Sequence, residues 1–161
     1  RQRQMCIRDR LPAGNVLNSG TGFLNPVEET TLTIPSTATK VITVGAYDAR
    51  FDQAAAFSGR GYTRATNQVK PDLVAPGVEI MSCAPGGGYQ VRTGTSMATP
   101  FVTGSAALLM QWGIVNGNDA YLYGEKMKAY LIRGARKLPG FTVYPNPVLG
   151  WGALCTANSI P

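Results

Sequence analysis

The chain has 161 residues, of which 44% are hydrophobic and 15% are charged, as in ordinary globular proteins and unlike disordered ones. Its length suits one domain. Histidine is absent, which excludes a histidine general base and a zinc site with histidine ligands inside these residues. No uninterrupted apolar run reaches the roughly 18 residues of a membrane span, so we expect none.

The formal net charge of +6 comes partly from the first ten residues, RQRQMCIRDR. This decapeptide has no apolar periodicity and no signal-peptide architecture, and we interpret residues 1–10 as a non-native or disordered leader to a domain over 11–161. Removing its four arginines and one aspartate leaves 11 basic and 8 acidic residues, a net charge of +3 spread along the chain. We therefore expect no nucleic-acid partner.

Short strands are expected in the first half of the chain. After a polar, glycine-rich start, one short strand is predicted near residues 31–34. The run KVITVGAY (40–47) is β-branched and nearly all apolar, which favours a strand buried on both faces, as in a parallel sheet. Two further strands are predicted over 72–75 and 78–83, and the sequence APGGG (84–88) predicts a tight turn.

Helices are expected in the second half. Residues 96–112 are apolar on nearly every side, which is typical of a helix in the middle of a protein, and Pro100 falls near its start, where proline is tolerated. Residues 119–134 predict an amphipathic helix on the outside, and the tail 141–161 is irregular. Buried strands together with an apolar helix predict an α/β layered protein.

The segment GTSMATP (94–100) places Ser96 at a glycine-flanked turn where the apolar helix begins. The first N–H groups of a helix and the positive end of its dipole stabilise negative charge at that point. This arrangement suits a nucleophile whose reaction builds an oxyanion. Serine is also a preferred helix N-cap, so the local pattern leaves a purely structural role for Ser96 open.

GTSMATP, followed by FVTGSAALL, resembles the nucleophile motif and buried helix of the subtilisin-like serine peptidases, or subtilases. Other segments resemble that family in the same order along the chain: ITVGA (42–46), Phe57-Ser58, VAPG (74–77) and VLGWGAL (148–154). The resemblance implies the C-terminal part of a three-layer α/β fold with a mostly parallel sheet and a buried central helix starting at Ser96. Details such as TIPSTA and FSGRGYTR resemble the clostridial germination-protease branch.

The resemblance also implies roles for individual residues. Ser96 matches the nucleophile of a serine endopeptidase that cleaves polypeptides without a metal or an organic cofactor. Asn15, in Ala13-Gly14-Asn15, resembles the family's side-chain donor to the oxyanion, with Asn18 as the competing candidate. Ala13 and Gly14 would form one wall of the pocket for the substrate side chain.

The family orders its catalytic triad as Asp, His, Ser along the chain, and this chain has no histidine. We therefore expect residues 11–161 to be the C-terminal half of a subtilase domain, inactive alone because its base is missing. A pseudoprotease that binds peptides or partners without cleaving them is the alternative. An α/β-hydrolase elbow at 94–98 is disfavoured, because that fold needs a histidine after the serine.

Other features carry little chemistry. Asp48, Asp52 and Asp72 are interpreted as cap, turn or salt-bridge residues, and Gly86–Gly88 lacks the lysine of a phosphate-binding loop. Cys83 and Cys155 have no metal-binding spacing, so we expect two free, buried thiols, with a single disulfide between them as the alternative. No calcium-loop pattern occurs, and the sequence leaves the oligomeric state and cellular location open.

Overall fold

The computed structural model describes residues 29–161, in which three strands form a sheet with the order β2-β1-β3. The central strand β1 (Val44–Asp48) runs parallel to β3 (Leu73–Pro76). It pairs antiparallel with the two-residue strand β2 (Gln53–Ala54) at its last two residues. The middle of β1 and most of β3 are buried, which confirms the parallel, core-forming strands expected from their apolar sequences.

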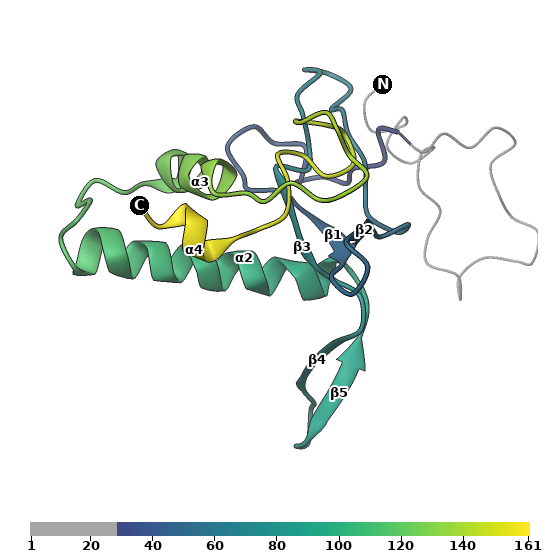
Figure 1. Cartoon of the computed structure of the whole chain (residues 1–161), viewed down its shortest axis with the longest axis horizontal. Helices are drawn as coiled ribbons and strands as arrows, with labels where there is room; N and C mark the ends of the chain where they lie inside the picture. Colours follow the sequence, from purple (N-terminus) through teal and green to yellow (C-terminus); the bar gives the residue numbers. More distant parts are fainter. Residues whose placement is uncertain (1–28) are drawn as a thin grey trace, which may run out of the picture.

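A second, two-stranded sheet is a hairpin that projects beyond the first turn of α2 (Figure 1). Its strands are β4 (Ile80–Cys83) and β5 (Tyr89–Arg92), and Ala84 N–H closes the turn by donating to Gly88 O at 3.0 Å. The glycines at 86–88 all have φ between 78° and 104°, a conformation that glycine adopts without strain. The tight turn predicted at APGGG is therefore confirmed.

The main helix, α2 (Thr95–Met110), continues into the π-helical turn η2 (Gln111–Val115). Ala98, Val102, Ser105 and Leu109 form its buried stripe, and the three apolar ones join the core with Leu73 and Ala75 of β3. The prediction that α2 is buried on all sides is wrong for the opposite face of the helix, where the exposed fractions of Phe101 and Leu108 are 42% and 50%. The reason is that, within residues 29–161, the sheet covers only one side of the helix.

By length and composition, the 21-residue segment Thr95–Val115 would be sufficient to cross a membrane, and it is the one such helix among the described residues. Core helices of soluble proteins meet the same criterion. In this structure α2 packs its buried stripe against β1 and β3.

Two shorter helices lie on the same side of α2 as the C-terminal tail (Figure 1). Helix α3 spans Gly124–Arg133 and buries Met127 and Leu131, as the amphipathic pattern predicted, and α4 spans Thr156–Ser159. The predicted helix 119–134 begins late. Residues 119–123 form a turn whose Asp119 carboxylate accepts hydrogen bonds from Lys126 Nζ (2.6 Å) and Tyr130 Oη (3.0 Å).

The face of the sheet away from α2 is covered by the tail. Tyr47 and Val74 point to this side and pack with Leu138, Leu149 and Ala153 in a second core cluster. The tail also runs beside β3, because Val74 N–H donates to Gly152 O at 2.9 Å and Leu154 N–H donates to Val74 O at 2.8 Å. A sheet with a helix on one face and packed chain on the other confirms the α/β layered class.

Two local predictions are wrong. Residues 34–37 form a turn, closed by Ala38 N–H donating to Pro35 O at 2.9 Å, rather than the end of a strand over 31–34. Pro35 has no N–H for a strand ladder, which disfavours pairing there. Cys83 and Cys155 are free, as expected, but Cys83 is exposed because β4 lies in the projecting hairpin.

Candidate active site

Ser96 is the second residue of α2, and its side chain is exposed in an open depression lined by Ser96, Thr99, Pro100 and Thr103. Gly94 is the N-cap, and no side chain caps the helix, so the interpretation of Ser96 as an N-cap is wrong. Within the described residues, neither the hydroxyl nor the main-chain N–H of Ser96 takes part in a hydrogen bond. Both groups are therefore available to a molecule bound in the depression.

Neighbouring hydroxyls of α2 are already occupied. Thr99 Oγ1 donates to Thr95 O at 3.0 Å, and Thr103 Oγ1 donates to Thr99 O at 3.2 Å. Such bonds back to the helix hold a hydroxyl against the main chain. Of the hydroxyls lining the depression, Ser96 alone among the described residues is free of a bond of this kind, which singles it out as the reactive candidate.

Pro100 also affects the main chain at Ser96. It is the sixth residue of α2 rather than part of the first turn, so the N–H that would bond Ser96 O in a regular helix is missing. The Ser96 carbonyl therefore lacks the helical donor that the residue four positions later would supply. The sequence predicted Pro100 in the first turn of the helix, where a missing N–H breaks no helical hydrogen bond.

The loop before Ser96 is fixed by the turn that follows β3. Gly77 N–H donates to Tyr47 O at 3.0 Å, and Gly94 N–H donates to Gly77 O at 2.8 Å. A Cβ at Gly77 would lie 2.6 Å from Ala46 Cβ and 3.0 Å from Gly94 O, too close for any side chain. The glycine of VAPG therefore lets β1, the β3 turn and the Ser96 loop approach each other closely.

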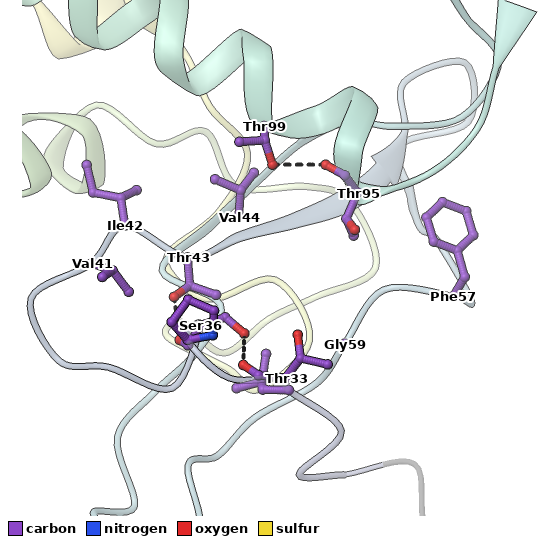
Figure 2. A pocket seen from close by; sticks show the side chains of 12 residues that line it. Thr33, Ser36, Val41, Ile42, Thr43, Val44, Phe57, Gly59, Thr95 and Thr99 are labelled. Atoms are coloured by element: carbon purple, nitrogen blue, oxygen red, sulfur yellow. Dashed lines mark hydrogen bonds between the residues drawn. The ribbon is translucent and has the colours of Figure 1, made fainter. Parts of the chain in front are cut away.

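A second concavity of about 330 Å³ lies beside the first turn of α2. In Figure 2 the side chains of Thr95 and Thr99 face it from α2, and those of Ile42 and Val44 face it from β1 and the segment just before it. Its lower wall is held by two hydrogen bonds: Thr43 Oγ1 donates to Ser36 O at 2.6 Å, and Ser36 Oγ donates to Thr33 O.

A buried charge cluster anchors the segment that forms this wall. Asp72 Oδ2 accepts from Lys70 Nζ and from Thr43 N–H, each at 2.7 Å, while Asp72 Oδ1 lies 2.7 Å from Lys128 Nζ. The side chains of Lys70 and Asp72 are only 2% and 4% exposed. Burial lowers the pKa of Lys70, and the hydrogen bond that Lys70 donates to Asp72 opposes that shift.

Two lysine ammonium groups also hold Val41 O: Lys70 Nζ donates to it at 2.9 Å and Lys128 Nζ at 3.2 Å. The sequence identified Asp72 as a salt-bridge candidate but missed both lysines. Residues 71–72 form a bend before β3, so strand alternation gave no signal for Lys70. No local signal could have found Lys128, which comes from a distant helix.

The other predicted site residues, Ala13, Gly14, Asn15 and the competing Asn18, lie outside the described residues, so their roles remain predictions. Within residues 29–161, no group of three or more His, Cys, Asp or Glu side chains gathers as a metal site would require.

Comparisons with known proteins agree with this architecture. The chain is 33% identical to the serine protease AprX of Bacillus subtilis over 97% of its own length and 37% of that protein. It is 40% identical to subtilisin of Bacillus pumilus over 61% of its own length and 30% of that protein.

The structure matches that of the Clostridium perfringens CspB protease with a TM-score of 0.85 and 47% identity, over 89% of this chain and 30% of that one. The patellamide maturation protease PatA matches with a TM-score of 0.65 and 27% identity, over 83% of this chain and 46% of that one. The chain thus spans less than half the length of each of these four relatives. A profile of the subtilase family matches residues 12–152, and the chain belongs to that family.

Proposed function

We propose that this chain carries the nucleophile of a serine endopeptidase, with Ser96 as the attacking residue and a polypeptide as substrate. The observation that supports this most directly is the state of Ser96. Its exposed hydroxyl and its main-chain N–H both lack partners within the described residues, at the N-terminus of a helix anchored in the core. Membership of the subtilase family also supports this role, because Ser96 stands in the segment that resembles the family's nucleophile motif.

In the proposed reaction a base removes the proton of Ser96 Oγ as that oxygen attacks a peptide carbonyl carbon. The amine product leaves, and water then hydrolyses the acyl-enzyme. The Ser96 N–H and the Asn15 side chain hold the negative charge on the former carbonyl oxygen, aided by the positive end of α2. Ala13 and Gly14 border the substrate side chain in this proposal.

The base comes from outside this chain, because the sequence contains no histidine. Without a base, the Ser96 hydroxyl is an ordinary alcohol with a high pKa and low nucleophilicity. We therefore propose that the chain alone is inactive and that residues 11–161 act as the C-terminal part of a larger subtilase domain. The chain's coverage of 37% of AprX supports this.

A fluorophosphonate probe, which modifies activated serines, tests the proposal. The chain alone should stay unlabelled, whereas the intact parent should label at Ser96, and Ser96→Ala in the parent should abolish labelling. Ser82→Ala is the matched control, because Ser82 is also exposed but lies on the hairpin strand β4. Efficient labelling of the chain alone would contradict a missing base.

If the intact parent also fails to label, the endopeptidase proposal falls. The alternative then becomes a subtilase scaffold that binds peptides without cleaving them. The role of Asn15 has its own test: Asn15→Ala should lower turnover of the parent by roughly 10²–10³, the loss that one such donor causes in subtilisin. Asn18→Ala is the matched control and should leave turnover nearly unchanged.

A further inference from the structure

The turn that follows the main helix contains the one Asn-Gly pair of the sequence, Asn116-Gly117. It lies between α2 and α3, at the end of the long helix away from the hairpin (Figure 1). Asn116 is the C-cap of η2, and Gly117 follows with a φ of 76°. Helices commonly end in a left-handed residue of this kind, which glycine adopts without strain. The way the helix ends therefore accounts for a glycine directly after this asparagine.

An asparagine side chain reacts with the main chain that follows it when two conditions are met. The nitrogen of the next residue attacks the side-chain carbonyl carbon and displaces ammonia, which makes asparagine one of the thermolabile residues. The reaction needs a side-chain amide that no hydrogen bond holds in place. It also needs a main-chain N–H after the asparagine that is not engaged elsewhere, and a following proline excludes it because proline has no N–H.

Asn116 meets both conditions. Asn116 and Gly117 are exposed. Within residues 29–161 the Asn116 side chain takes part in no hydrogen bond, the Gly117 N–H donates none, and Asn116 O accepts none. A Cβ at Gly117 would meet nothing within 4 Å. The peptide group between the two residues is therefore free to rotate from the present Asn116 ψ of 0° towards the side chain.

The other asparagines among the described residues fail at least one condition. Asn146 is followed by Pro147, which has no N–H. The N–H groups that follow Asn67, Asn118 and Asn158 are all engaged: Gln68 N–H donates to Thr63 Oγ1 (2.8 Å), Asp119 N–H to Gly113 O (2.9 Å) and Ser159 N–H to Cys155 O (3.1 Å). Asn118 is held twice, because its side-chain amide also donates to Trp112 O at 2.8 Å. Within residues 29–161, Asn116 alone is free to react.

We propose that Asn116 is a site of spontaneous deamidation. The Gly117 nitrogen forms a bond to Asn116 Cγ, the Cγ–Nδ2 bond breaks, and ammonia leaves with the proton that the Gly117 N–H loses. Water then opens the resulting cyclic imide at either of its two carbonyl carbons, which gives aspartate or isoaspartate at position 116. Water is the only reactant consumed, and one amide is exchanged for one carboxylate.

The new carboxylate lies at the C-terminal end of the helical segment Thr95–Val115, which has 21 residues. The main-chain carbonyls at that end already carry partial negative charge, so a further negative charge destabilises the helix. At 1.5 Å per residue the segment is about 30 Å long, several times the distance over which salt screens charges. Ser96, at the opposite end, is therefore not affected electrostatically, and deamidation acts on stability alone.

The test is incubation of the full chain at neutral pH and physiological temperature, followed by mass spectrometry of the tryptic peptide 93–126. Fragmentation should place the mass change from amide to acid at residue 116, with an equal amount of ammonia released. Asn116 should convert about tenfold or more faster than Asn118, because each hydrogen bond that holds Asn118 and Asp119 changes a population by up to about tenfold. Hydroxylamine, which traps cyclic imides, should cleave the chain between residues 116 and 117.

Urea separates the effect of the structure from that of the sequence. Unfolding releases the hydrogen bonds of Asn118 and Asp119, so conversion of Asn118 should accelerate by about tenfold or more, while conversion of Asn116 should stay nearly the same. Asn116→Gln should abolish the reaction at this position, because the longer side chain would have to close a six-membered ring. Asn158→Gln is the matched control, at an exposed position of α4, and should leave conversion of Asn116 unchanged.

Conversion of Asn116 that is about tenfold or more slower in the folded chain than in urea would overturn the proposal, as would equal conversion of Asn116 and Asn118 in the folded chain. Asn116→Asp should lower Tm at neutral pH, and an unchanged Tm would contradict the charge effect. The peptidase proposal is tested separately. Asn116→Gln should leave fluorophosphonate labelling of Ser96 in the intact parent unchanged, and a parent that fails to label would not alter the deamidation result.

Discussion

The main-chain N–H of Gly94 donates a 2.8 Å hydrogen bond to the carbonyl oxygen of Gly77, which joins the turn after β3 to the loop that presents Ser96. Gly77 in turn donates to Tyr47 O on β1. The position of the nucleophile candidate is therefore tied to two neighbouring strands of the sheet through main-chain bonds. One side chain adds to this connection, because Thr93 Oγ1 accepts a hydrogen bond from Glu79 N–H at 2.9 Å.

Gly77→Ala should destabilise the chain by about 1–3 kcal/mol, because its Cβ would lie 2.6 Å from Ala46 Cβ and overpack the joint. The amide resonances of Gly94 and Thr95 should shift as the loop moves. Gly104→Ala is the matched control in the middle of α2, where a Cβ meets nothing within 4 Å. That variant should be more stable by about 0.5–1 kcal/mol, and urea unfolding measures both. Equal effects of the two would contradict the packing at Gly77.

Asp72→Ala should cost about 3–5 kcal/mol, because it leaves the buried Lys70 ammonium without its counter-charge and Thr43 N–H without its acceptor. Equilibrium unfolding of the variant measures this loss. Asp48→Asn tests the opposite case, since Asp48 pairs with the half-exposed Arg50 at the surface. Asp48→Asn should lower the free energy of unfolding by at most about 1 kcal/mol. A larger loss would contradict the idea that burial of the ion pair makes the Asp72 variant so unstable.

Two adjacent leucines test the orientation of α2. Leu109 is fully buried, so Leu109→Ala should cost about 2–5 kcal/mol, while Leu108, at 50% exposure, should cost less than about 1 kcal/mol on the same change. Thermal unfolding of the two variants under the same conditions measures this difference in stability. A reversed order would show that the opposite face of the helix contacts the sheet.

The Asp119 carboxylate gives a pH-dependent contribution to stability. Hydrogen bonds from Lys126, followed by Tyr130, lower the pKa of Asp119 below its usual value. A carboxylate with a lowered folded-state pKa stabilises the fold above its unfolded pKa of about 4, and that contribution is lost as the pH falls through the lower, folded value.

Asp119→Asn should therefore lower Tm at pH 7, with the difference from the parent chain shrinking below about pH 4. Glu125→Gln is the control: Glu125 lies on α3 with Lys126 and Tyr130, in an exposed pair with Lys40. A Tm difference for Asp119→Asn that stays constant from pH 7 to pH 3 would contradict a role for the ionised carboxylate.

The sequence by itself determined the α/β class, the strands β1 and β3, the apolar helix and the candidate nucleophile Ser96. These features depend on hydrophobic periodicity and short motifs, which are read within a few neighbouring residues. The same local pattern left the N-cap interpretation of Ser96 open. Only the structure excluded it, by starting α2 one residue earlier, at Thr95.

The tertiary structure decided everything that depends on partners distant along the chain. It placed Lys128 of α3 on Asp72, buried one face of α2 and exposed Leu108, and formed no strand at 31–34, where one was expected. Among the residues that the structure describes, it also left the main chain of Val44 without a hydrogen-bond partner on one side of β1. Local hydrophobic patterns predict which residues are buried. The element that buries each of them is decided by tertiary packing between segments that are far apart in the chain.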